Sequence, residues 1–191
     1  MLLRLSSLST HRPAVLALLL ACLLLAGSAR AADDYTQVQQ LQSAGQTAQA
    51  LAAADAYIKE HPRDPQMRFI KANVLSASGQ AAEAQALLLQ LTRDYPELAE
   101  PWNNLAVLYA AGGHLAQARD ALQNALRVQP DYATALANLG DVQAREALQS
   151  FERARQTKAD DPQLPAKIEA LQGLWGAAPK PTPAPTPAPK P

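Results

Sequence analysis

The sequence predicts an all-helical protein, an α-α superhelix built from a repeated pair of helices. Between Asp33 and Trp175, nearly every segment is rich in alanine, leucine and glutamine, with apolar residues three and four positions apart. That spacing fits one face of an α-helix, and runs of β-branched residues are nearly absent. Prolines that end helical stretches recur at intervals of 34, 34 and 32 residues, a period that indicates a helical repeat; they are Pro62, Pro96, Pro130 and Pro162.

Residues 1–31 have the pattern of a secretory signal peptide. A basic stretch from Arg4 to Arg12 precedes an apolar run over residues 14–27, and residues 29–31 (Ala-Arg-Ala) have the pattern of a cleavage site. The run is shorter than the roughly 20 residues that a membrane-spanning helix needs. We therefore expect an exported, periplasmic protein whose mature chain begins near Ala32 and has no transmembrane segment.

The single cysteine, Cys22, lies within this leader. Cleavage would leave a chain without a thiol, a disulfide or a cysteine metal site. Residues 19–22 loosely resemble a bacterial lipobox, so lipid anchoring through Cys22 is an alternative. The apolar run continues through residues 23–25, however, whereas polar residues usually follow a lipidated cysteine. Cleavage without lipidation is therefore the main prediction.

Removal of the leader changes the charge balance from 17 basic and 17 acidic residues to 14 and 17, because Arg4, Arg12 and Arg30 leave with it. The mature chain is then mildly acidic and has no basic cluster that could bind a phosphate backbone or an anionic membrane. We expect no nucleic-acid partner.

The sequence ends in proline alternating with alanine, lysine or threonine over residues 178–191. Proline lacks an amide donor and fixes φ near −65°, so neither helix nor sheet is expected. We predict that residues 176–191 form an extended, disordered, proline-rich tail. Such a tail acts as a semi-rigid spacer or as a ligand for an aromatic groove, and both interpretations stay open.

Each repeat has a second break near its middle, at Gly45, Gly79 and Gly112-Gly113. Glycine there supplies the positive φ that ends a helix, so each repeat should be two helices joined by a tight turn. We expect a helical domain over residues 32–175. Its parts are repeats at about 31–64, 65–98 and 99–132, a truncated repeat at 133–162 and a cap at 163–175.

These residues resemble the tetratricopeptide repeat family. The repeat from Ala99 to Pro130 carries the family's residue types at nine positions: Trp102, Leu105, Ala106, Tyr109, Gly113, Ala118, Leu122, Ala125 and Pro130. The preceding repeat matches at Ala72, Leu75, Gly79, Ala84, Leu88 and Pro96, and the first more weakly at Leu41, Gly45, Ala50 and Pro62. The small residues should let helices approach closely, and Trp102 and Tyr109 should fill the core between them.

The fourth repeat departs from the family, since Gly140 and Ala147 are 7 residues apart where the family has 12. No glycine or proline lies between Asp141 and Lys158, so we predict one continuous helix from about Tyr132 to Lys158. A last amphipathic helix should follow from Gln163 to Leu174. Four of its residues are predicted to pack back as a C-terminal cap, which repeat arrays need: Ile168, Leu171, Leu174 and Trp175.

The resemblance implies a concave groove, lined by the first helices of successive repeats, that binds a partner protein or peptide. Asparagine amides would hold the backbone of an extended peptide, while apolar groups contact its side chains. The same asparagines also serve helix packing in the family, and that interpretation stays open. The implied groove residues are Gln66, Phe69, Asn73, Glu100, Asn103, Asn104, Val107, Ala111, Thr134, Asn138 and Asp141.

No catalytic motif or metal-ligand pattern is found in the sequence. The mature chain has two histidines, His61 and His114, about 53 residues apart, and no glycine-rich phosphate loop. We therefore predict no enzyme activity, no cofactor and no metal. The expected function is that of a protein-binding adaptor or scaffold of the bacterial cell envelope. Alternatives are a structural spacer that uses the proline-rich tail, or an assembly factor for an envelope complex.

Overall fold

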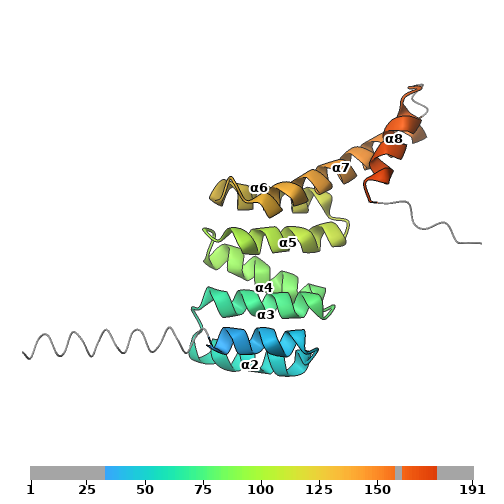
Figure 1. Ribbon diagram of the computed structural model, residues 1–191. Coiled ribbons are helices and arrows are strands. Elements are labelled where there is room, and N and C mark those ends of the chain that lie inside the picture. The colour runs from blue at the N-terminus through green and yellow to red at the C-terminus, as the bar shows by residue number, and fades with distance from the viewer. Residues whose placement is uncertain (1–32, 158–160, 176–191) are drawn as a thin grey trace, which may run out of the picture. The chain divides into compact units, whose positions relative to one another are not determined.

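The computed structural model of the protein describes residues 33–157 and 161–175. Within these ranges every regular element is a helix, so the predicted fold class is confirmed (Figure 1). The predicted signal peptide, Cys22 and the proline-rich tail lie outside the described residues. The first helical segment covers residues 33–43. The others are α2 (Thr47–Glu60), α3 (Pro65–Ala77), α4 (Ala81–Asp94), α5 (Ala99–Ala111), α6 (Leu115–Val128), α7 (Ala133–Gln156) and α8 (Leu164–Gly173).

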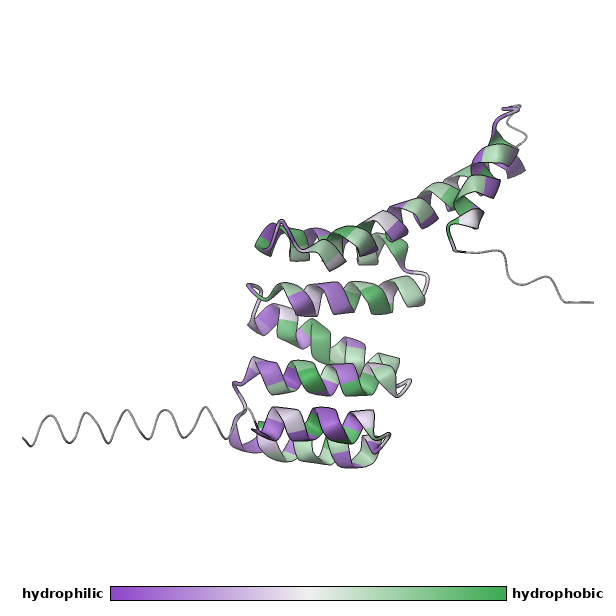
Figure 2. Ribbon diagram, viewed as in Figure 1, coloured by the Kyte–Doolittle hydropathy of each residue, from purple (hydrophilic) through white to green (hydrophobic). Residues whose placement is uncertain are grey.

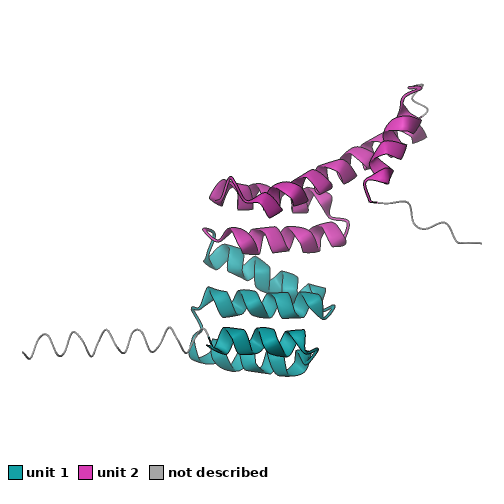
Figure 3. Ribbon diagram, in the orientation of Figure 1, with its two compact units in different colours: residues 1–96 teal, residues 97–191 magenta. Residues whose placement is uncertain are grey.

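The chain divides into two compact units, residues 1–96 (unit 1) and residues 97–191 (unit 2) (Figure 3). In unit 1, α2 packs on α3, and α3 packs on α4. In unit 2, α5 packs on α6, α6 on α7 and α7 on α8, while α5 also contacts α7. Hydrophobic and hydrophilic residues alternate along these helices, as expected where only one side of a helix is buried (Figure 2).

The predicted turn glycines end the first helix of each hairpin. Gly45, Gly79 and Gly113 have φ angles of 73°, 80° and 78°, which confirms the positive φ expected there. At each turn, the residue after the glycine donates its N–H to the carbonyl five residues earlier, as from His114 to Tyr109 at 2.9 Å. These hydrogen bonds satisfy carbonyl groups that the end of a helix would otherwise leave without partners.

The alanines predicted to lie between the helices are buried in both units. Ala72 and Ala84 are fully buried in unit 1, and Ala106, Ala118 and Ala125 are at most 1% exposed in unit 2. A methyl side chain lets two helix backbones come close, and larger residues fill the remaining space. In unit 2 these residues include Trp102 and Tyr109, which pack against the core as predicted.

Asp64 connects three helices of unit 1. One carboxylate oxygen, Oδ1, accepts the backbone N–H groups of Gln66 at 2.8 Å and Met67 at 3.3 Å, and so caps α3. The other, Oδ2, accepts the hydroxyl of Tyr57 on α2 at 2.8 Å and that of Tyr35 on residues 33–43. Burial acts to raise the pKa of Asp64, but these four hydrogen bonds outweigh it and lower the pKa below its usual value.

The fourth repeat contains the continuous helix that the missing turn predicted. Helix α7 runs for 24 residues, and Gly140 lies within it without interrupting it. On α6, the guanidinium of Arg119 pairs with the carboxylate of Glu146 on α7 at 2.8 Å. The last helix, α8, then buries Leu164 and Ile168.

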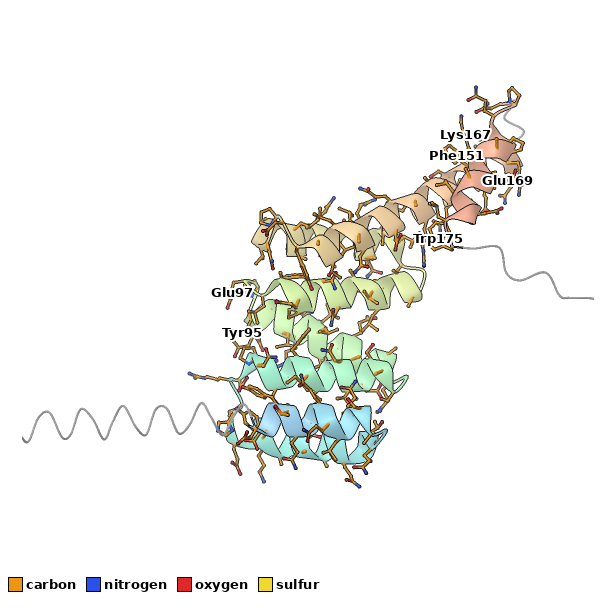
Figure 4. The ribbon with its side chains drawn as sticks, in the orientation of Figure 1. Tyr95, Glu97, Phe151, Lys167, Glu169 and Trp175 are labelled. Carbon is orange, nitrogen blue, oxygen red and sulfur yellow. The ribbon has the colours of Figure 1, made fainter. Side chains whose placement is uncertain are left out.

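One prediction for the C-terminal cap is wrong. Leu174 and Trp175 were expected to pack back with Ile168, but they are 63% and 38% exposed. Both residues follow Gly173, the last residue of helix α8. Trp175 instead lies beside α7, where the guanidinium carbon of Arg145 is 5.5 Å from the centre of its ring (Figure 4).

Candidate functional site

Helices α5, α6 and α7 of unit 2 surround a pocket of about 230 Å³. Four residues come from α5, one from α6 and four from α7. Its walls are therefore built mainly from the two helices that the sequence assigns to the first position of the third and fourth repeats. The lining residues are Ala106, Val107, Ala110, Ala111, Leu122, Asn138, Asp141, Val142 and Arg145.

The helical repeat explains why these side chains meet. On α5, Val107 and Ala111 are four residues apart, which places them one above the other on one face. On α7, Asn138, Val142 and Arg145 follow at intervals of four and three residues and share a face in the same way. The α5 wall consists of alanine and one valine, so short side chains leave the space that forms the pocket.

An asparagine pair positions one wall of the pocket. The side-chain amide of Asn138 on α7 donates to Oδ1 of Asn103 on α5 at 2.9 Å. The amide of Asn103 in turn donates to Oδ1 of Asn104 at 3.1 Å. Asn103 is only 4% exposed, so its amide links the two helices and does not face the solvent. Its role in the structure is to hold Asn138 at the rim of the pocket.

The pocket combines exposed aliphatic surface with opposite charges. Val107 is 48% exposed at its edge. The carboxylate of Asp141 is exposed and forms no hydrogen bond or ion pair with any residue that the structure describes. Arg145, one turn further along α7, is also exposed and faces the ring of Trp175. A segment lying in the pocket would therefore meet apolar side chains, an amide and a carboxylate within two turns of helix.

Four of the residues implied by the family resemblance are brought together here: Val107, Ala111, Asn138 and Asp141. Asn103 and Asn104 lie behind them in the hydrogen-bonded chain described above. Glu100 and Thr134 are exposed on α5 and α7 but do not line the pocket. The pKa of Tyr132 is raised above its usual value, mainly by burial and to a smaller extent by the nearby charge of Glu100.

The other three implied residues belong to unit 1 and line no part of this pocket. Gln66 is exposed on α3, while Phe69 and Asn73 are half-buried on the same helix. Asn73 has an interaction partner within the structure. The implied groove residues therefore fall into two sets, one on α3 of unit 1 and one around the pocket of unit 2.

Five lining residues were not predicted as groove residues: Ala106, Ala110, Leu122, Val142 and Arg145. Ala106 and Leu122 were expected only to pack between helices. Ala110 precedes the predicted Ala111, and Val142 and Arg145 lie four and seven residues after the predicted Asn138. Helical spacing from Asn138 could therefore have found Val142 and Arg145. The side chain facing Arg145, Trp175, could not have been found in this way, because it follows the end of α8.

In the described ranges, no group of three or more histidine, cysteine, aspartate or glutamate side chains is placed to hold a metal ion. None of the helices in these ranges has the length and apolar character needed to span a membrane.

Comparisons with known proteins identify the repeat. Two family models, both described as tetratricopeptide repeat, match residues 41–106 and 103–163, and together they cover well over half of the chain. No curated protein matches the sequence.

Several solved structures are similar. YrrB, described as a tetratricopeptide repeat protein with an unusual peptide-binding site, is 26% identical with a TM-score of 0.50, over 55% of this chain and 54% of YrrB. The chain therefore spans about half the length of YrrB. TTC0263, a tetratricopeptide repeat protein of Thermus thermophilus, is 24% identical with a TM-score of 0.55, over 75% and 82% of the two chains. The first repeat domain of Spaghetti (RPAP3), solved with an HSP90 peptide, is 13% identical with a TM-score of 0.56, over 60% and 90%.

Proposed function

Because the chain belongs to the tetratricopeptide repeat family, we propose that it is a non-enzymatic module that binds an extended segment of a partner protein in the pocket of unit 2. The observation that carries this proposal is the pocket itself, where the half-exposed Val107 lies beside an amide and a carboxylate at its rim. Exposed apolar surface bordered by polar groups is typical of interaction sites. The similarity to YrrB, which has a peptide-binding site, gives further support.

The size of the pocket favours a peptide over a small molecule. At about 230 Å³ it is smaller than the roughly 300–1,000 Å³ usual for small-molecule sites. A peptide needs less volume, because only some of its side chains enter the pocket while its backbone lies across the rim. An adaptor that works in this way needs no catalytic group.

The lining residues define the chemistry of the partner segment. Val107, Ala110 and Val142 would contact an aliphatic side chain. The amide of Asn138 uses one N–H to bind Asn103, which leaves its second N–H and its carbonyl oxygen for the backbone of the peptide. The carboxylate of Asp141 favours a lysine or arginine in the partner. The segment should thus be extended, with an aliphatic residue close to a basic one.

We place this activity in the bacterial cell envelope, on the strength of the leader sequence in residues 1–31. The mature protein would be periplasmic, and its partner an envelope protein. Mass spectrometry of the mature N-terminus tests this location. A chain that begins near Ala32 agrees with it, whereas a lipid on Cys22 would mean membrane anchoring and an intact residue 1 would contradict export.

Selection from a displayed library of random peptides tests the binding function. Val107→Glu places a charge in the pocket, and Leu136→Glu is its matched control, because Val107 and Leu136 are 48% and 50% exposed but only Val107 lines the pocket. Both positions are half-exposed, so both variants should keep the stability of the parent within about 0.5 kcal/mol.

We expect the parent and Leu136→Glu to enrich the same peptides, with aliphatic and basic residues close together. Val107→Glu should bind those peptides at least about tenfold more weakly, which corresponds to about 1.4 kcal/mol of binding free energy. Equal binding by the two variants would exclude the pocket as the binding site.

A further inference from the structure

We propose that the proline-rich tail of this same chain, residues 176–191, binds in the pocket of unit 2 and competes there with the partner segment. This inference rests on the proposed function, because it assigns a second occupant to the same pocket. The tail lies outside the described residues, but its attachment point, its length and its chemistry all suit it to this pocket.

The tail follows directly on a residue that contacts the lining of the pocket. Trp175 is the last described residue, and the guanidinium carbon of Arg145 lies 5.5 Å from the centre of its ring (Figure 4). Arg145 is itself a lining residue. The contact between a guanidinium and an indole ring is favourable and holds Trp175 next to α7. Trp175, the residue that precedes the tail, is therefore in contact with a lining residue of the pocket.

The tail is long enough to enter the pocket and is held close to it. Its 16 residues, if extended as the prolines predict, would reach about 50 Å at roughly 3.1 Å per residue. A segment tethered to the protein binds in an intramolecular step, which raises its effective concentration at the site. Weak intrinsic affinity is therefore enough for substantial occupancy, which an untethered peptide of the same sequence would not reach.

The chemistry of the tail matches that of the lining. An extended proline-rich chain makes no internal hydrogen bonds, so its carbonyl groups need donors. Asn138 has an amide N–H beyond the one bound to Asn103, and Arg145 adds its guanidinium at the same wall. The short side chains of Val107 and Ala111 form a wall on which proline rings can pack closely.

The charges are also complementary. Residues 97–175 contain ten acidic and seven basic side chains, whereas the tail contains Lys180, Lys190 and no acidic residue. Asp141, whose carboxylate forms no ion pair with a described residue, is the acidic group that lines the pocket. A lysine of the tail would supply the basic residue that the pocket favours.

Paramagnetic relaxation NMR on the full chain tests the proposal. Cys22→Ser removes the single cysteine, and Ala184→Cys then carries a nitroxide label within the tail. Spectra are compared for this protein and for two charge reversals in it. Asp141→Lys changes the pocket, while Asp131→Lys is the control, since Asp131 is another exposed acid of unit 2 that does not line it.

We expect the label to broaden the methyl signals of Val107 and Val142 more strongly than those of Val128, an exposed valine outside the pocket. Asp141→Lys should remove this preference and Asp131→Lys should keep it. A tail that only moves at random near unit 2 would broaden all exposed methyl groups alike in every variant, and that result would overturn the proposal.

A mixture of nitroxide-labelled, isotope-free protein with unlabelled, isotope-enriched protein shows whether the tail binds in its own chain or in a second copy. Broadening in the mixture equal to that within one molecule means that a second copy donates its tail, which overturns binding within the chain. If the tail shows no preference for the pocket while the library peptides still depend on Val107, the tail proposal fails alone. If both experiments fail, the proposed function fails with it.

Discussion

Two glycines of this chain should respond to the same substitution in opposite directions. Gly79 has a φ of 80° in a turn, whereas Gly140 lies inside helix α7, and an added Cβ meets no atom within 4 Å at either position. Only the backbone conformation differs. Gly79→Ala should lower the free energy of unfolding by about 1–2 kcal/mol, because an L-residue is strained at positive φ. Gly140→Ala should raise it by up to about 1 kcal/mol.

Chemical denaturation followed by circular dichroism measures both changes. If Gly79→Ala were neutral, the turn would not require positive φ. If Gly140→Ala were destabilising, Gly140 would not lie in a regular, open stretch of helix.

Sequence reasoning at the level of single residues succeeded where spacing alone decides the environment. The turn glycines follow from the repeat period and the buried alanines from the resemblance to the repeat family, and the structure confirms both. It failed for Trp175, because helical spacing shows which face a residue would occupy but not where the helix stops. The burial of Asn103 could not be predicted either, because it depends on the contact with Asn138 of α7.

The junction at Asp64 determines how three helices of unit 1 are held. Asp64→Asn keeps the shape of the side chain and its capacity to cap α3 but removes the charge that four hydrogen bonds stabilise. Hydrogen bonds to charged groups contribute about 1.5–3 kcal/mol when well buried. Because Asp64 is only partly buried, we expect a loss of about 1–2 kcal/mol. Asp55→Asn, which breaks the exposed pair with Lys71, should cost less than about 1 kcal/mol.

The same junction predicts a dependence on pH. The pKa of Asp64 is lower in the folded chain than its ordinary value of 3.8, so the unfolded chain binds the proton more readily. The stability contributed by the carboxylate is therefore present above about pH 4 and is lost as the pH falls through the folded-state pKa. The difference in unfolding free energy between the parent and Asp64→Asn should shrink in that window. A difference that stays constant down to low pH would contradict this account of the junction.

The sequence also predicted the helices themselves well, including the unusual one. The absence of a glycine or proline after Asp141 predicted a single long helix, and α7 shows it. A turn needs a residue that tolerates an unusual backbone conformation, so its absence is informative. The position of Arg145 along α7 could also be inferred from helical spacing. Its contact with Trp175 could not, because that contact depends on how α8 folds back.

For the whole molecule, the repeat determines what kind of surface the chain offers but not what binds there. Helices α5 and α7 supply most of the pocket lining, and four of the residues implied by the family resemblance lie there. Asn103 was implied as a groove residue that could also serve helix packing, and in the structure its side-chain oxygen accepts a hydrogen bond from Asn138. Such a distinction depends on which polar groups find partners within the fold, and that cannot be worked out from one helix at a time.

We propose that a partner segment binds in the pocket between α5 and α7. An NMR titration of the isotope-enriched protein with a peptide selected from the library shows directly whether it does. The largest shift changes should fall on the methyl groups of Val107 and Val142 and on the side-chain amide of Asn138. Changes confined to α3 of unit 1, or to exposed groups outside the pocket such as Leu136 and Val128, would contradict it.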